Sequence, residues 1–207
     1  MIKNILWDFD GVILDSMQVR DYGFRKIFEE HTHEQVEKLI KYHRTNGGWS
    51  RYVKIRYFYE EILGQNISEK EVLALANKFS NIMREELIKP EHLIDDSLKF
   101  IENNHTNFNF HIVSGSDENE LRFLCKELKL DSYFITINGS PIAKNKLVFT
   151  VLKDFGYKKE ETILIGDSIN DYEAAKVNSI EFYGYNNTKL MEQSREYIES
   201  FDEHQLR

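Results

Sequence analysis

Two aspartates stand two residues apart near the start of the sequence, in the segment Asp8-Phe9-Asp10-Gly11-Val12. Residues two apart in an extended segment point to the same side of the backbone, so both carboxylates can reach one reacting group. One carboxylate can attack phosphorus to form an aspartyl phosphate, while the other protonates the leaving alcohol and later deprotonates water. The spacing therefore indicates a nucleophile, Asp8, beside a general acid and base, Asp10.

Polar residues also follow three later apolar runs: Ser114 and Gly115, then Lys144, then Asp167 and Asp171. A hydroxyl, an ammonium group and backbone amides can together neutralise the oxygens of a phosphoryl group. Up to four carboxylates gathered in one site could not stay ionised together without a cation. Carboxylates combined with water and phosphate oxygens suit magnesium, a hard ion that is usually held by few protein ligands. The residue set therefore favours phosphoryl chemistry with Mg²⁺.

Each of these signals also has a purely structural interpretation. Aspartates are common in surface turns, and Asp167 and Asp171 could cap the helix that follows them. Ser114 could end its strand with a hydrogen bond from its hydroxyl to the backbone, and Lys144 could be an ordinary surface lysine. The ordered set, in which each member follows an apolar strand, favours the functional interpretation.

Five apolar runs of strand length alternate with segments of helix length. They cover residues 2–7, 108–113, 133–137, 162–165 and 180–183. Parallel neighbours need crossover connections, so the alternation predicts βαβ units and a mainly parallel sheet with helices on both faces. The expected fold class is a doubly wound, Rossmann-like α/β core made by residues 1–14 and 90–207. The residues that carry chemistry should meet at the C-terminal edge of its strands.

Residues 15–89 follow helical periodicity instead. Asn46-Gly47-Gly48 separates the first two helical segments, and Ser68 followed three residues later by Glu71 predicts a cap for the third. This block is expected to form an all-α cap domain, inserted after the first strand and lying over the C-terminal ends of the strands.

The loop between the first two cap helices combines glycines with two arginines, Arg44 and Arg51. Amides and guanidinium groups presented in this way could bind an anionic substrate. The alternative is a simple helix break with two solvated arginines. Arg20 has a weaker claim, because it is expected on a helix face.

The composition is that of a globular protein without a membrane or nucleic-acid partner. Of 207 residues, 41% are hydrophobic, and no apolar run approaches the roughly 20 residues that cross a bilayer. The net charge of -8 disfavours nucleic acid and anionic lipid, so a small phosphorylated metabolite is the expected partner. A single cysteine, Cys125, fits a reducing cytoplasm. Residues 189–207 are expected to form an amphipathic terminal helix or a fraying tail.

Taken in order, these stretches resemble the haloacid dehalogenase superfamily over most of the chain, with a helical cap inserted after the first motif. The resemblance implies that Asp8 is the nucleophile and Asp10 the general acid and base. It also implies a bound Mg²⁺ and a lysine that steadies both the phosphate and the nucleophile. The implied phosphate-binding residues are Ser114, Gly115 and Lys144, with Lys146 as a second candidate for the lysine. The implied metal ligands are Asp8, Asp10 through its main-chain carbonyl, and Asp167, with Asp171 supporting or joining them.

The expected activity is magnesium-dependent hydrolysis of a small phosphate monoester, such as a sugar phosphate or a phosphoglycolate-like compound. Superfamily members that remove halide lack the second aspartate of the first motif, so Asp10 argues for phosphoryl chemistry. A phosphomutase on the same scaffold is one alternative. The other is a non-catalytic phospho-acceptor module, similar in layout to a response-regulator receiver.

Overall fold

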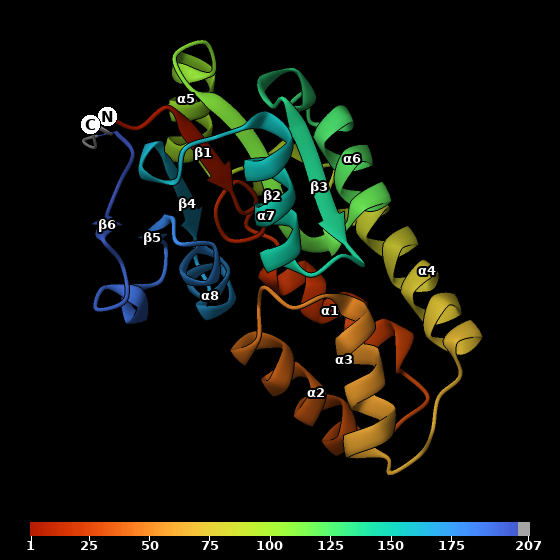
Figure 1. The fold of residues 1–207 in the computed structure, drawn as a ribbon. Coiled ribbons are helices and arrows are strands. Elements are labelled where there is room, and N and C mark those ends of the chain that lie inside the picture. Colours follow the sequence, from red (N-terminus) through yellow and green to blue (C-terminus); the bar gives the residue numbers. More distant parts are fainter. Residues whose placement is uncertain (203–207) are drawn as a thin grey trace.

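A parallel sheet forms the centre of the computed structural model, which describes residues 1–202. Its strands lie in the order β3-β2-β1-β4-β5-β6, so the first strand of the chain is inside the sheet and later strands extend to both sides (Figure 1). Every neighbouring pair is parallel. The strands are β1 (Asn4–Trp7), β2 (Asn109–Asp117), β3 (Thr136–Ser140), β4 (Thr162–Gly166), β5 (Glu181–Tyr185) and β6 (Glu196–Ile198). The predicted doubly wound α/β fold class is confirmed.

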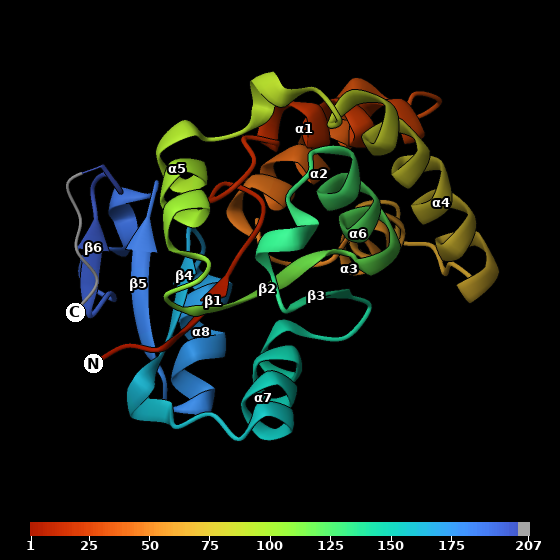
Figure 2. The same cartoon turned by 90° about the horizontal axis from the view of Figure 1, so that it is seen from above.

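Helices cover both faces of the sheet, with α5 and α6 on one face and α7 and α8 on the other (Figure 2). Strand β1 is buried on both faces, and its residues Ile5, Leu6 and Trp7 are apolar. Ile5 and Trp7 pack in one core cluster with Leu121 of α6, whereas Leu6 packs in a second cluster with Val148 of α7. The helices are α5 (Asp95–Asn104), α6 (Glu118–Glu127), α7 (Lys144–Phe155) and α8 (Ile169–Asn178), and short 3₁₀ turns span Pro90–His92, Asp131–Tyr133, Lys159–Glu161 and Thr188–Leu190.

Four further helices gather at the C-terminal ends of the strands (Figure 1). They are α1 (Met17–Ile27), α2 (His33–Thr45), α3 (Arg51–Tyr57), which continues into a π-helical turn over Phe58–Ile62, and α4 (Glu69–Glu86). Two of them begin with a capping box, formed by Thr32 with Gln35 and by Ser68 with Glu71. Residues 15–89 are called the cap segment below, and the rest of the chain the core.

The chain enters and leaves the cap segment at one place. Leu14 and Leu93 form an antiparallel bridge, and the backbone N–H of Asp15 donates to the carbonyl of His92 at 2.7 Å. Both crossings therefore lie beside the loop that follows β1. The domain boundaries predicted after residues 14 and 89 stay predictions.

Three strands lie later in the chain than the apolar runs predict. Strand β2 continues past Val113, because Asp117 still pairs with Ser140 of β3. A 3₁₀ turn spans Asp131–Tyr133, and β3 begins only at Thr136. Strand β5 continues to Tyr185. The polar residues at these strand ends are held by backbone pairing, which an apolar pattern does not reveal.

The terminal helix predicted over residues 189–207 is wrong for the described part, which ends at residue 202. Strand β6 pairs with β5 there, and Ile198 and Phe201 are buried. The ring of Phe201 lies 5.4 Å from that of Trp7. Strand pairing and core contact thus outweigh the local helical pattern. Residues 203–207 lie outside the described residues. Within residues 1–202, no helix has both the length and the apolar character needed to cross a membrane.

Candidate active site

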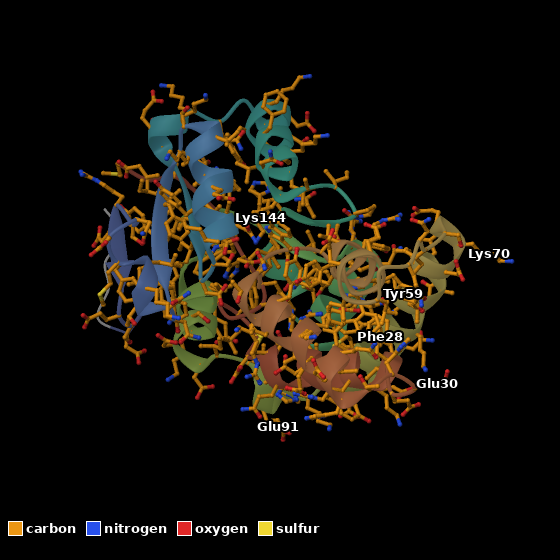
Figure 3. All side chains as sticks on the ribbon, turned by 90° about the horizontal axis from the view of Figure 1, so that it is seen from below. Phe28, Glu30, Tyr59, Lys70, Glu91 and Lys144 are labelled. Carbon is orange, nitrogen blue, oxygen red and sulfur yellow. The ribbon has the colours of Figure 1, made fainter. Side chains whose placement is uncertain are left out.

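Asp8 follows β1 directly and is buried. Its backbone N–H donates to the carbonyl of Ile165 in β4 at 2.9 Å, so the sheet fixes its position. Lys144, the first residue of α7, places Nζ 2.8 Å from Asp8 Oδ1 and also pairs with Asp171 of α8. Figure 3 shows Lys144 near the centre of the molecule. Residues that lie far apart in the sequence therefore meet at the edge of the sheet, as predicted for parallel strands.

Asp167 and Asp171 join Asp8 in an acidic cluster. Each of the three offers a carboxylate oxygen, and these oxygens lie within 4.8 Å of one another. Gly11 leaves room for this approach: its φ is +77°, and a Cβ at this position would lie 2.1 Å from Oδ2 of Asp167. Any side chain there would both strain the backbone and displace a carboxylate, so the loop requires glycine.

The electrostatics of this cluster fit a divalent cation. Burial and the negative charge of Asp171 raise the pKa of Asp8 to about 7, although Lys144 opposes them. Burial and the charge of Asp8 hold the pKa of Asp167 well above its usual range. One ammonium group does not balance the charge of three carboxylates, two of them buried, and carboxylate oxygens are the ligands that Mg²⁺ prefers. Asp8 and Asp167, supported by Asp171, are thus suited to hold the predicted metal.

Asp171 also caps helix α8. The backbone N–H of Ser168 donates to Asp171 Oδ2 at 3.0 Å, and the Ser168 hydroxyl donates to the same oxygen at 2.6 Å. The other carboxylate oxygen, Oδ1, contacts Lys144. The helix-cap interpretation of Asp171 therefore holds together with its place in the acidic cluster.

The carboxylate of Asp10 contacts a different set of groups. The hydroxyls of Ser16 and Ser116 each donate to it at 2.5 Å, and Nε of Arg20 donates at 2.8 Å. Burial acts to raise the pKa of Asp10, but the charge of Arg20 and the hydroxyl hydrogen bonds outweigh it and lower the pKa. The Asp10 side chain lies outside the three-carboxylate cluster, and the metal contact through its main-chain carbonyl stays a prediction.

Ser114 and Gly115 lie in β2, near its C-terminal end, and line the same cavity as Asp8. Ser114 is buried, and its Oγ accepts a hydrogen bond from the backbone N–H of Ser116 at 3.2 Å. Lys146, the second candidate for the phosphate lysine, is exposed on α7. The geometry therefore favours Lys144 for that role.

The two arginines predicted for substrate contact are placed differently. Arg51 of α3 is buried and makes two hydrogen bonds to Glu120 of α6, from Nη1 at 2.5 Å and from Nη2 at 2.7 Å. Arg44 has a side chain that is 60% exposed, and its Nε donates to Asp21 at 2.9 Å beside a separate surface hollow. Arg51 thus lines the cavity but is already ion-paired with Glu120, whereas Arg44 lies outside the cavity.

Arg20, expected on a helix face with a weak claim to function, is buried in the site. Besides its bond to Asp10, its Nη1 donates to Glu120 at 3.2 Å. Glu120, Ser116 and Lys54 also line or support the site and were not identified from the sequence. The spacing of Ser16 and Arg20, one helical turn apart, was the available signal for Arg20, whereas nothing local marks Glu120.

These groups surround a cavity of about 130 Å³ between the core and the cap segment. Its lining includes Asp8, Asp10 and Ser114 of the core and His43, Arg51 and Lys54 of the cap segment. The cap segment rests directly on the core here, since a Cβ at Gly115 would lie 2.2 Å from the carbonyl oxygen of Gly48. Sites for drug-sized ligands measure roughly 300 Å³ or more, so this cavity suits a smaller molecule.

Comparison with known proteins identifies a family and a shared fold. The family model described as haloacid dehalogenase-like hydrolase matches residues 5–185. Beta-phosphoglucomutase from Clostridium difficile has a similar structure, with a TM-score of 0.79 and 17% identity over 100% of this chain and 94% of that chain. CbbY from Rhodobacter sphaeroides, solved in complex with phosphate, gives a TM-score of 0.76 and 14% identity over 98% of this chain and 96% of that chain.

A third similar structure is a predicted phosphoglycolate phosphatase from Haemophilus somnus, with a TM-score of 0.74 and 14% identity over 97% of this chain and 95% of that chain. Identities this low establish the fold alone. No curated protein sequence gives a significant match to this chain.

Proposed function

Because this chain belongs to the haloacid dehalogenase-like hydrolases, we propose that it is a magnesium-dependent phosphatase that hydrolyses a small phosphate monoester through a phosphorylated Asp8. The observation that carries the proposal is the contact between Lys144 and Asp8 inside a cluster of three carboxylates. Such an arrangement can accept phosphoryl oxygens and a divalent cation together.

Two carboxylates divide the proton and phosphoryl steps in this proposal. Ionised Asp8 attacks phosphorus while Asp10, in its protonated form, gives its proton to the leaving alcohol. Asp10, now a carboxylate, then takes a proton from the water that attacks the aspartyl phosphate. The phosphoryl group ends as inorganic phosphate, and both carboxylates return to their starting states. The hydrogen bonds from Ser16 and Ser116 hold Asp10 in position between these steps.

Other residues bind and orient the phosphoryl group. The hydroxyl of Ser114 and the amide of Gly115 donate to phosphoryl oxygens, and Lys144 holds Asp8 in place while neutralising part of the charge. Asp8, Asp167 and the main-chain carbonyl of Asp10 would hold Mg²⁺, which supplies positive charge that stabilises the phosphoryl oxygens. The cap segment keeps bulk water from the site while it rests on the core.

A phosphomutase is the second candidate, favoured by the structural likeness to beta-phosphoglucomutase. The two activities differ in where the phosphoryl group goes. A mutase would isomerise a sugar phosphate, in the presence of a bisphosphate activator, faster than it releases phosphate. The buried single cysteine, Cys125, supports a reducing, cytoplasmic setting for either enzyme.

The test measures phosphate release from a panel of small phosphate esters with purified protein and Mg²⁺. We expect turnover that chelation by EDTA abolishes and that added Mg²⁺ restores. Asp8→Asn should lose turnover while circular dichroism remains that of the folded protein, and Asp154→Asn, the same change on the exposed side of α7, should keep turnover. Turnover by Asp8→Asn would exclude Asp8 as the nucleophile.

A further inference from the structure

Three buried cations around the cavity already have carboxylate partners. Arg20 pairs with Asp10 and Glu120, Arg51 pairs with Glu120, and Lys144 pairs with Asp8 and Asp171. The two arginines of the cap segment are therefore neutralised by the protein itself. A substrate anion on the cap side of the cavity would have to compete with Glu120 for them.

A fourth buried cation, Lys54 of α3, has no carboxylate partner among residues 1–202. Its Nζ donates to Nδ1 of His43 at 2.8 Å and to the carbonyl oxygen of Gly47 at 3.1 Å. A lysine ammonium carries three N–H groups, so one is left for a further acceptor. Lys54, His43 and Gly47 all line the cavity that contains Asp8.

The surroundings of Lys54 disfavour its charged form. Burial and the positive charge of Arg20 lower the pKa of Lys54 to about 7. Burial and the charge of Lys54 lower the pKa of His43 to about 2, so the imidazole is neutral, and its Nδ1 accepts when Lys54 is an ammonium group. The carboxylates of Asp10 and Asp21 act to raise the pKa of Lys54, but neither forms an ion pair with Nζ, and an anion beside Nζ would stabilise its charged form.

We propose that the substrate carries a second anionic group, a carboxylate or a second phosphate, and that Nζ of Lys54 binds this group at the cap side of the cavity. The inference rests on the proposed phosphatase function, which assigns the reacting phosphoryl group to Asp8 at the core side. The cavity of about 130 Å³ limits the link between the two groups to a short carbon chain. The substrate class is therefore short phosphate esters with a second acidic group.

The test compares three short esters with Mg²⁺ present. Ethyl phosphate has no second anion, 2-phosphoglycolate ends in a carboxylate, and ethylene glycol bisphosphate ends in a phosphate. Binding is measured by calorimetry on Asp8→Asn protein, and kcat/KM is measured on the wild type. We expect at least one acidic ester to exceed ethyl phosphate by roughly tenfold or more in both measurements, and the better of the two identifies the anion.

Variants separate the charge of Lys54 from its packing. Lys54→Gln should remove most of the preference for the acidic ester, and Lys54→Arg should keep part of it because the positive charge is retained. Lys70→Gln makes the same change on exposed helix α4, at the outer edge of the cap segment in Figure 3, and should keep the full preference.

The outcomes distinguish this inference from the proposed function. Equal binding of all three esters by the protein, or an equal proportional loss for all three in Lys54→Gln, would overturn the role of Lys54 even when turnover is normal. Tight binding of an acidic ester without turnover of any ester by the wild type would instead overturn the phosphatase function and leave the anion site in place.

Discussion

The two aspartates of the first motif have opposite electrostatic surroundings. Burial and the charge of Asp171 raise the pKa of Asp8, whereas Arg20 and two hydroxyl donors lower that of Asp10 against the effect of burial. The sequence gives no sign of this difference in pKa, which comes from the partners that the fold brings to each aspartate. In the proposed reaction, the lowered pKa of Asp10 suits the step in which its carboxylate takes a proton from water, and a cation bound beside Asp8 would favour the ionised nucleophile.

His111 of β2 gives a pH-dependent contribution to stability. Burial lowers its pKa to about 4, and its ring nitrogens lie 2.8 Å from Thr136 Oγ1 and 3.0 Å from the Tyr157 hydroxyl. In the unfolded chain a histidine has a pKa near 6.5, which is about two to three pH units above the pKa of His111 in the folded protein. Between these values only the unfolded state is protonated, so stability is present above about pH 6.5 and is lost as the pH falls toward about 4.

Urea unfolding of the wild type and of His111→Gln, at neutral pH and at about pH 5, measures this pH-dependent loss of stability. The wild type should lose more stability over the interval than the variant, because glutamine does not titrate. His33→Gln, a change at an exposed histidine, should behave as the wild type. The pKa of buried His43 is lowered as well and affects all three proteins alike, so equal losses in wild type and His111→Gln would contradict the prediction.

The role of a single residue was predictable where its position in the sequence, at the end of an apolar strand, indicates it. Asp8, Ser114 and Asp167 each lie at or just beyond an apolar strand core, and parallel topology then brings them together. No such sequence pattern identifies Glu120 and Lys54. Their roles depend on partners in other elements, and helix periodicity does not indicate which charged residues are buried.

At the scale of elements, one carboxylate joins three helices. Glu120 of α6 is fully buried and accepts hydrogen bonds from Arg51 of α3 and from Arg20 of α1. Helix α6 belongs to the core, whereas α1 and α3 belong to the cap segment. This ionic contact therefore fixes the cap helices to the core beside the cavity.

Glu120→Gln should destabilise the protein strongly. It leaves two buried guanidinium groups with one carboxylate fewer, and removing one partner of a buried ion pair costs roughly 3–5 kcal/mol. Urea unfolding measures the loss. Glu127→Gln, on the exposed side of the same helix, should change the free energy of unfolding by no more than about 0.5 kcal/mol. Equal unfolding midpoints for the two variants would show that the ionic contact does not hold the helices.

Elements were predictable where local pattern and tertiary environment agree. The capping box of α4 was visible in Ser68 and Glu71, and β1 was visible in its apolar residues Ile5, Leu6 and Trp7. Strand β6 was not, because the spacing of Tyr197, Ile198 and Phe201 among charged residues also fits an amphipathic helix. Pairing with the edge of β5 determines that this segment forms a strand, and the local sequence does not indicate such pairing.

At the scale of the whole molecule, the structure has the cap segment closed on the core. The backbone of Gly48 lies so near Gly115 that no Cβ fits between them. On its other side, Gly48 lies against Ser168 and Asn170 at the start of α8. The loop around Gly48 thus lies between the C-terminal part of β2 and the start of α8, directly over the proposed phosphate site.

Gly115→Ala should prevent this seating. Its Cβ would meet a backbone carbonyl, so the loop around Gly48 must move away, and a displacement of this kind lowers kcat/KM by roughly tenfold to a hundredfold. Backbone amides of residues 46–50 should exchange hydrogen faster, while urea unfolding of the core changes little. Gly47→Ala, where a Cβ would meet only Met17 at 3.9 Å, should lose far less activity. Similar losses in both variants would contradict the prediction.

The position of β1 inside the sheet has a consequence for biosynthesis. Ile5 pairs with Phe110 on one side and with Ile163 on the other, and both partners are translated long after it. During most of translation this buried strand therefore has no partner, while the cap segment emerges complete. Long-range parallel pairing forms slowly and leaves apolar surface open to aggregation. We therefore expect the apolar residues of β1 to stay exposed on the nascent chain until β2 and β4 leave the exit tunnel.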